Sequence, residues 1–230
     1  MALLGIAPMA MAAPPETWSL DPVHTRVLFA VEHAGFSHAL GTVSGSTGTL
    51  VFDRDDWAYA RLDVQVPLQR LDLGDEKWNK AVLASNLVDA GHHPQAHFVS
   101  SRVEPVDADH ARVCGELSLR GVTRPLCMDV TLNAVKRHPL PPFRRTAGFS
   151  ATATLSRAEF GMTAWKNVIG DRVELRIEAE ALRDRGAGEP AEGADDVAPP
   201  TDAVPTEPAS EPATPASQQP DDPAAESTTP

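Results

Sequence analysis

The sequence predicts an all-β protein with antiparallel strands and one helix. Eight segments between residues 18 and 183 alternate apolar with polar residues, as strands do when one side is buried and the other faces water. A single interruption, GDEKWNKAVLASNLVDAGHHP, shows helical spacing instead. Because one helix cannot cover a whole sheet of eight strands, the strands must either form two packed sheets or close into one barrel.

The eight strand segments have an apolar residue at every second position, and these residues are expected to point inward. In chain order they are Val27, Phe29 and Val31, followed by His33 on the same side; the stretch from Leu40 to Phe52, interrupted by Gly41, Gly45 and Gly48; Leu62, Val64 and Val66; Phe98, in a strand from about Ala96 to Val103; Val113, Leu117 and Leu119; Leu126, Met128, Val130 and Leu132; Phe149, Ala151, Ala153 and Leu155; and Val173, Leu175, Ile177 and Ala179.

The predicted helix begins after Asp75, which can cap it, and continues until Gly91 and Pro94 stop it. Its apolar residues at helical spacing are Trp78, Val82, Leu83 and Leu87.

The segment LSLRGVTRPLCMDVTL predicts a β-hairpin whose register follows from its pattern. Both apolar sides point inward together only if the loop has an even length, which Arg120-Gly121 provides as a two-residue turn. That register places Cys114 directly opposite Cys127, in the closer kind of antiparallel pair. These are the only cysteines of the chain, and either a disulfide or two neighbouring free thiols fits the pattern.

The C-terminal segment, residues 184–230, predicts a disordered tail. It holds 11 Asp and Glu against one basic residue, 10 of the 21 prolines and no aromatic residue. Such a segment buries too little apolar surface to offset the entropy of ordering. We expect a solvated extension, with a partner-binding arm as the alternative. The remaining chain is nearly balanced in charge and shows no basic patch that would argue for nucleic-acid binding.

Residues 1–12 predict an export signal. Small residues at Ala10 and Ala12 fit cleavage after Ala12, although no Lys or Arg precedes Arg26. We expect a signal peptide truncated by the choice of start codon, with a frayed apolar terminus as the alternative. No later stretch approaches the ~20 apolar residues that a membrane span needs. Export places the protein in the periplasm or outside the cell, where disulfides persist.

The inward side of the strands consists mainly of Val, Leu, Ile and Ala. Between residues 18 and 183 the chain has only 12 aromatic residues, several of them in loops or on the helix. In a closed barrel, slim aliphatic walls suit a long and narrow apolar ligand. The same residues also pack ordinary sandwiches, so the pattern alone leaves an apolar cavity and a self-packed core both open.

Several blocks of sequence resemble the YceI-like family, in family order, over about residues 17–182. WSLDPVHTRVLFAVEH carries its D-P-x-H-S/T and V-x-F-x-V-x-H patterns, and VCGELSLRGVTRP its glycine-containing hairpin. LASNLVDAGHHPQAHFVSS resembles the segment after its helix, with Leu87-Val88 in place of the usual aromatic residue before Asp89. The motif residues of the first and last blocks are Trp18, Asp21, Pro22, His24, Thr25, Val27, Phe29, Val31, His33, Gly41 and Val43, then Arg157, Phe160, Gly161, Met162, Gly170, Asp171 and Val173.

The resemblance implies an eight-stranded antiparallel, lipocalin-like barrel over residues 17–183, exported in Gram-negative bacteria, that holds a polyisoprenoid or isoprenoid-quinone chain. Quinone, polyprenyl phosphate and fatty acyl chain all stay open as the ligand. We expect binding and carriage without catalysis or a cofactor, and a membrane-associated lipid donor or acceptor; a monomer and a homodimer both stay open. The alternative is an interaction or stress protein that acts through its outer surface or tail and has a self-packed barrel. The expected ligand-binding residues are Val27, Phe29, Val31, His33, Leu62, Val64, Phe98, Val113, Leu117, Met128, Val130, Phe149, Arg157, Phe160, Val173, Leu175 and Ile177.

Two of these residues are polar and have two interpretations each. His33 and Arg157 continue the inward sides of their strands, so each could contact a ligand head group. A structural histidine at a strand end and an arginine that braces the following turn fit equally well.

The segment HHPQAH offers His92, His93 and His97 as metal ligands, but Pro94 breaks the helical geometry between them, so we expect no metal site. The sequence also contains no nucleophile elbow, phosphate loop or HExxH motif, so we expect no enzyme.

Overall fold

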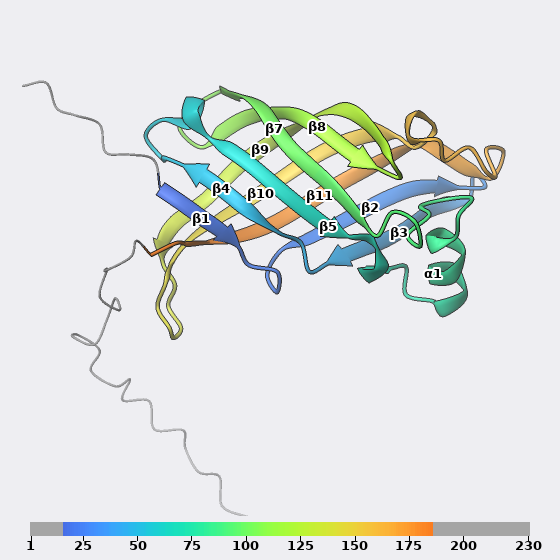
Figure 1. Ribbon diagram of the computed structural model, residues 1–230, viewed down its shortest axis with the longest axis horizontal. Coiled ribbons are helices and arrows are strands. Elements are labelled where there is room, and N and C mark those ends of the chain that lie inside the picture. Colours follow the sequence, from blue (N-terminus) through green and yellow to red (C-terminus); the bar gives the residue numbers. More distant parts are fainter. Residues whose placement is uncertain (1–15, 186–230) are drawn as a thin grey trace, which may run out of the picture. The chain divides into compact units, whose positions relative to one another are not determined.

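The computed structural model describes residues 16–185, which form an antiparallel β-barrel with one α-helix (Figure 1). β1 pairs with β4 on one side and with β11 on the other, and this second pairing closes the sheet. The strands are β1 (Glu16–Leu20), β2 (Arg26–His33), β3 (Ser37–Ser44), β4 (Thr47–Phe52), β5 (Arg61–Pro67), β6 (Leu71–Asp72), β7 (Gln95–Pro105), β8 (His110–Leu119), β9 (Val122–Arg137), β10 (Arg145–Ser156) and β11 (Ile169–Arg183). The helix is α1 (Glu76–Leu83), and the 3-10 turns are η1 (Trp57–Tyr59), η2 (Leu68–Arg70) and η3 (Ala158–Phe160).

The eleven strand segments make a barrel of eight strands, as the sequence predicts, because three of these eight strands are interrupted and consist of two segments each. β1 and β2 pair with successive parts of β11. β4 pairs with β1, and β3 pairs with β2. β5 then pairs with β4, and β6 pairs with β3. The predicted closed barrel is confirmed. β1 is a strand that the pattern did not predict, since it is cut off by Asp21-Pro22 after only two apolar residues, Trp18 and Leu20.

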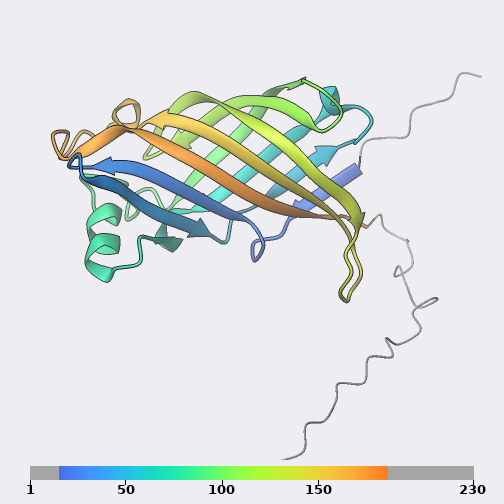
Figure 2. The same cartoon turned by 180° about the vertical axis from the view of Figure 1, so that it is seen from behind.

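Three long strands form one wall of the barrel, on the side that Figure 2 brings to the front. β9 has 16 residues, β10 has 12 and β11 has 15. A strand of this length extends over about 50 Å, so the barrel interior is long relative to its width. Within residues 16–185, no helix is long and apolar enough to cross a membrane.

The hairpin of β8 and β9 has the predicted register. Leu119 faces Val122 across the turn residues Arg120 and Gly121, which both have positive φ, at 54° and 72°. Further out, Cys114 faces Cys127 with a Cα–Cα distance of 4.0 Å, and a disulfide joins them. The close pair of strands therefore carries a covalent link.

Helix α1 begins where predicted but ends earlier. The Asp75 carboxylate accepts hydrogen bonds from two backbone N–H groups of the first turn, at 2.9 and 3.1 Å. The prediction that the helix continues to Gly91 is wrong, because the chain leaves the helix after Leu83 and folds back in turns. Ser and Asn at 85–86 favour turns over helix, and this turn buries Val88 against the barrel.

One end of the barrel is packed solid with aromatic rings. The Phe52 ring contacts the Trp57 ring edge-on at 5.2 Å between centroids and the Phe149 ring at 5.5 Å. Trp18 is buried beside them, at the start of the barrel. The interior is therefore closed at the end where β1 begins and β11 ends.

The expected signal peptide (residues 1–12) lies outside the described residues, and so does the expected tail apart from Asp184 and Arg185.

Candidate functional site: an apolar cavity inside the barrel

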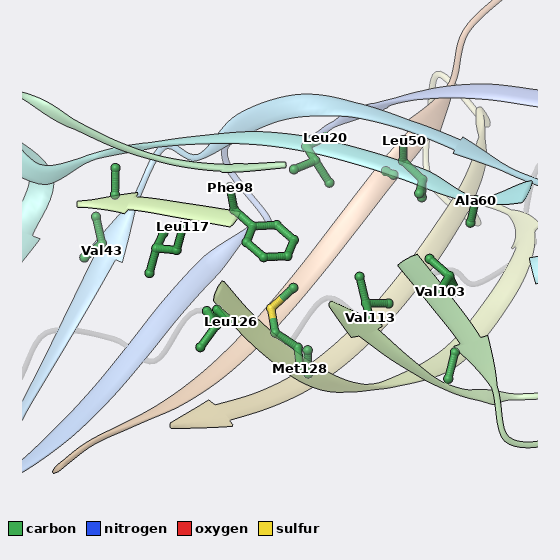
Figure 3. Close-up of a cluster of buried hydrophobic side chains, with 14 of the residues drawn as sticks. Leu20, Val43, Leu50, Ala60, Phe98, Val103, Val113, Leu117, Leu126 and Met128 are labelled. Carbon is green, nitrogen blue, oxygen red and sulfur yellow. The ribbon is translucent and has the colours of Figure 1, made fainter. Parts of the chain in front are cut away.

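The barrel encloses a cavity of about 500 Å³, which is lined by side chains from all eight strands of the barrel. That volume lies within the ~300–1,000 Å³ typical of small-molecule sites. Figure 3 shows Phe98, Leu117 and Met128 pointing from neighbouring strands into the shared interior space. Most of the lining is aliphatic or aromatic, and its only polar side chains are those of Thr25, Glu32, His33, Ser46, Arg61 and Arg157. The alternative of a barrel packed with its own side chains therefore does not hold for this interior.

Side-chain burial shows which end of the cavity is open. Val27, Phe29, Val31, Val173 and Leu175 point inward near the α1 end, yet they are only half-buried. Inward-facing residues keep this exposure only where the space in front of them is not filled by protein atoms. Near the aromatic end Trp18, Phe52 and Trp57 are buried, although Phe149 is only half-buried, whereas at the α1 end Trp78 both lines the cavity and is 44% exposed. The cavity therefore opens beside α1 and ends blindly at the aromatic cluster.

All but one of the residues expected to bind a ligand line this cavity. Whether they contact a ligand stays a prediction. The lining members are Val27, Phe29, Val31, His33, Leu62, Val64, Phe98, Val113, Leu117, Met128, Val130, Phe149, Arg157, Val173, Leu175 and Ile177.

Phe160 is the exception, because it does not line the cavity. The strand alternation stops at Arg157, whose backbone is helical, and η3 carries Phe160 out of the strand pattern. The ladder between β10 and β9 also ends early, at Thr152 opposite Asp129. Phe160 is buried beside Leu126 at this gap, so it seals the barrel wall from outside.

Arg157 braces the turn that follows it, which is the second of its two interpretations. Its guanidinium donates to the backbone carbonyls of Gly170 (2.8 Å), Ala164 (2.9 Å), Ile169 (2.8 Å) and Met162. Four of its five N–H groups are thus used within the loop. Burial lowers the pKa of Arg157 below its usual range, although the nearby Asp171 carboxylate opposes that change. The side chain reaches the cavity wall, but its hydrogen bonds serve the loop.

His33 lies at the open end of the cavity, at the last residue of β2. Its ring is 5.2 Å from the ring of Trp78 on α1, with a tilt of 41°. This contact fastens the helix to the barrel at the mouth. Trp78 itself lines the cavity and is also partly exposed to solvent.

Four other histidines, His24, His92, His97 and His110, contact carboxylates. His92 contacts Asp89 at 2.8 Å, and His97 contacts Asp63 at 2.7 Å on the neighbouring strand. His24 is 2.8 Å from Asp21 and 4.0 Å from Glu180. Two histidines of the segment HHPQAH, His92 and His97, thus have different carboxylate partners.

The strand pattern missed the part of the lining that lies outside the strands. Trp78, Ala81 and Val82 of α1 line the cavity, and Leu87 and Val88 do so from the turn after it. The helical spacing of Trp78 and Val82 was the available signal, since a helix beside a barrel turns its apolar side towards the opening. Trp57 of η1 lines the opposite end, in a segment without any periodic pattern.

A match to a known domain covers most of the barrel. Residues 18–181 match the YceI-like domain. The chain belongs to the YceI-like family. Among YceI-like relatives, a UPF0312 protein of Pectobacterium atrosepticum is 28% identical over 162 residues, which cover 70% of this chain and 83% of that protein. A UPF0312 protein of Shewanella baltica is 27% identical over 185 residues, which cover 79% of this chain and 96% of that protein.

Solved structures share the YceI-like barrel. BcnA of Burkholderia cenocepacia superposes with a TM-score of 0.63 at 21% identity, over 70% of this chain and 98% of that one. A domain from Saccharophagus degradans, described as polyisoprenoid binding and implicated in plant cell wall breakdown, gives a TM-score of 0.54 at 14% identity, over 73% and 98%. At sequence identities of 21% and 14%, the similarity to these structures shows a shared fold.

Proposed function

We propose that this protein binds one polyisoprenoid or isoprenoid-quinone chain in its cavity and carries it without changing it chemically. The observation that carries the proposal is an apolar cavity of about 500 Å³ that is blind at the aromatic end and open beside α1. Such a tube accepts a flexible chain end-on. The description of the Saccharophagus degradans domain as polyisoprenoid binding supports the same ligand class.

Chain length decides whether such binding is stable. Each buried methylene group contributes about 0.8 kcal/mol, so one five-carbon isoprene unit contributes about 4 kcal/mol. Association costs about 4–15 kcal/mol in lost translational and rotational freedom, and ordering of the chain adds to this. One unit at about 4 kcal/mol only equals the lower end of this cost, whereas about four units, at about 16 kcal/mol, exceed its upper end. Long prenyl chains should therefore bind and short ones should not.

The polar lining favours a neutral head group. At the open end the polar lining side chains are Glu32, His33 and Arg157, and most of the Arg157 N–H groups already donate to backbone carbonyls. Within the lining, a phosphate would meet Glu32 without an available guanidinium to balance it, because the lysines at this end of the barrel do not line the cavity. A quinone ring needs only a hydrogen-bond donor, which His33 can supply. We therefore place a quinone ahead of a polyprenyl phosphate.

We further propose that the protein works in the periplasm of a Gram-negative bacterium, with membrane-associated donors or acceptors of the lipid. The disulfide between Cys114 and Cys127 supports an oxidising compartment. One barrel has room for its own ligand, so a homodimer is not required for carriage.

The test is to identify what the barrel holds. Protein purified under mild conditions is extracted with organic solvent, and the extract is analysed by mass spectrometry. We expect one isoprenoid lipid per chain in the wild type. The variant Leu175→Trp fills the cavity from β11 and should lose the lipid, whereas Arg176→Trp adds the same bulk to the outer face and should keep it.

Both variants must keep the β-sheet circular dichroism signal of the wild type. A wild-type extract without lipid, or lipid that stays bound in Leu175→Trp, would contradict the proposal. An empty wild-type barrel would favour a protein that acts through its outer surface.

A further inference from the structure

Four large apolar side chains are exposed around the mouth of the cavity. Their exposed fractions are 92% for Phe36, 63% for Trp165, 44% for Trp78 and 39% for Val168. We call these four residues the mouth patch. They come from three segments that meet at one end of the barrel in Figure 1: the turn between β2 and β3, helix α1, and the loop between β10 and β11.

Direct contacts make the mouth patch one surface. The backbone N–H of Ala34 donates to the carbonyl oxygen of Val168 at 2.6 Å, which joins the turn of Phe36 to the loop of Trp165. The His33 ring contacts the Trp78 ring and also lines the cavity. The exposed aromatic side chains therefore surround the entrance through which a ligand must pass.

The fold holds Trp165 in solvent. Its φ is 56°, a backbone conformation that bulky residues adopt only where the surrounding structure imposes it. Arg157 fixes the loop on both sides of Trp165, through hydrogen bonds to the carbonyls of Ala164 and Ile169. A buried guanidinium thus positions an indole that is not packed into the core.

Lysines accompany the aromatic residues. Lys77, Lys80 and Lys166 are three of the four lysines in the chain, all three are exposed, and they flank Trp78 and Trp165. None of the three forms an ion pair with any residue between 16 and 185. Tryptophan beside free lysine is the composition of membrane–water interfaces, where the indole lies among head groups and the ammonium reaches phosphates.

We propose that the open end of the barrel docks on the surface of a phospholipid bilayer through the mouth patch and these three lysines. The docked orientation places the cavity entrance against the bilayer, so an apolar chain passes between membrane and protein without crossing water. The step of chain transfer rests on the proposed function, whereas docking itself does not. Glu32, Asp75 and Glu76 lie at the same end and offset the positive charge of the three lysines, so the aromatic side chains contribute most.

The test is flotation of the full-length protein with vesicles of phosphatidylethanolamine and phosphatidylglycerol that contain no isoprenoid. We expect the wild type to float with the vesicles. Trp165→Ala should lower the partition coefficient by about tenfold, and combination with Phe36→Ala should abolish flotation. Lys166→Glu should lower it by about fivefold at low salt. Tyr59→Ala is the matched control, because Tyr59 is 66% exposed at the opposite end.

A wild type that does not bind these vesicles would overturn the inference and leave a protein partner for the mouth patch. Equal losses in Trp165→Ala and Tyr59→Ala would also overturn it. Leu175→Trp should float like the wild type even if it has lost its lipid. Loss of the cavity ligand and loss of docking are therefore measured separately.

Discussion

The bend between β1 and β2 is held by a pair of side chains that titrate. His24 Nδ1 lies 2.8 Å from Asp21 Oδ2, and the backbone N–H of Val23 donates to Asp21 Oδ1 at 2.8 Å. The contact with Asp21 holds the pKa of His24 above its usual 6.5. Burial by itself would raise the pKa of Asp21, but the hydrogen bonds from His24 and Val23 outweigh it and keep that pKa below 3.8.

These two pKa changes predict a pH window for the contact. The part that depends on His24 is complete below pH 6.5 and is lost as the pH rises through the raised pKa. The part that depends on Asp21 is complete above pH 3.8 and is lost as the pH falls through the lowered pKa.

In Asp21→Asn, the pKa of His24 should fall back towards 6.5, and the free energy of unfolding should drop more at pH 5 than at pH 9. NMR titration of His24 and urea unfolding measure both; a His24 pKa unchanged by the substitution would rule out Asp21 as the cause.

Individual residues show where the alternating strand pattern correctly predicts which side chains face the cavity, and where it does not. Parity placed Val27, Leu117 and Leu175 correctly on the cavity wall, because regular strands keep their alternation. The same rule failed for Phe160, since the backbone of Arg157 turns helical and ends the alternation. No local signal marks that change, which depends on carbonyl groups up to 13 residues away that hold the Arg157 guanidinium.

At the scale of elements, the hairpin of β8 and β9 carries a measurable share of the stability. The disulfide spans a sequence separation of 13 residues. Closing a loop of this size stabilises a protein by about 3 kcal/mol in the chain-entropy model. We expect the double variant Cys114→Ala/Cys127→Ala to lose about 2–3 kcal/mol in urea unfolding while keeping its barrel. Wild type treated with a reducing agent is the control and should unfold at the midpoint of the variant; a variant as stable as oxidised wild type would refute the expected contribution.

Elements were predictable where local chemistry determines them. The two-residue turn at Arg120-Gly121 follows from parity and from a glycine at positive φ, so the register of the hairpin could be worked out. The end of α1 could not, because turns beyond Leu83 that bury Val88 compete with helical spacing. β7 contains a further irregularity between Ser100 and Arg102, which shifts its inward side to Val103. Such bulges depend on neighbouring strands and leave little trace in the sequence.

At the scale of the whole molecule, closure of the barrel depends on contacts between distant parts of the chain. Alternation alone fits a sandwich as well as a barrel, so closure was predicted only through the family resemblance. It is achieved where β1 meets β11, with Trp18 opposite Arg183 and Leu20 opposite Ala181. Beyond the ladder, the Asp184 backbone N–H donates to the Thr17 carbonyl at 2.8 Å. These pairs depend on the sequence as a whole and no short pattern contains them.

Two truncations test where the folded unit ends. Deleting residues 190–230 removes only acidic, proline-rich sequence and keeps every pair between β1 and β11, so Tm should stay within about 1 °C of wild type. Deleting residues 182–230 also removes two of the three β1–β11 pairs and the ion pair of Arg183 with Glu16 at 2.9 Å. Most of the β1–β11 pairing that closes the barrel would then be lost. Tm should fall by roughly 10 °C, which corresponds to a loss of about 3 kcal/mol in the free energy of unfolding for a domain of this size. Thermal unfolding followed by circular dichroism distinguishes the two. A large loss in the first deletion would mean that the tail stabilises the barrel, and an unchanged Tm in the second would mean that the barrel does not need this pairing.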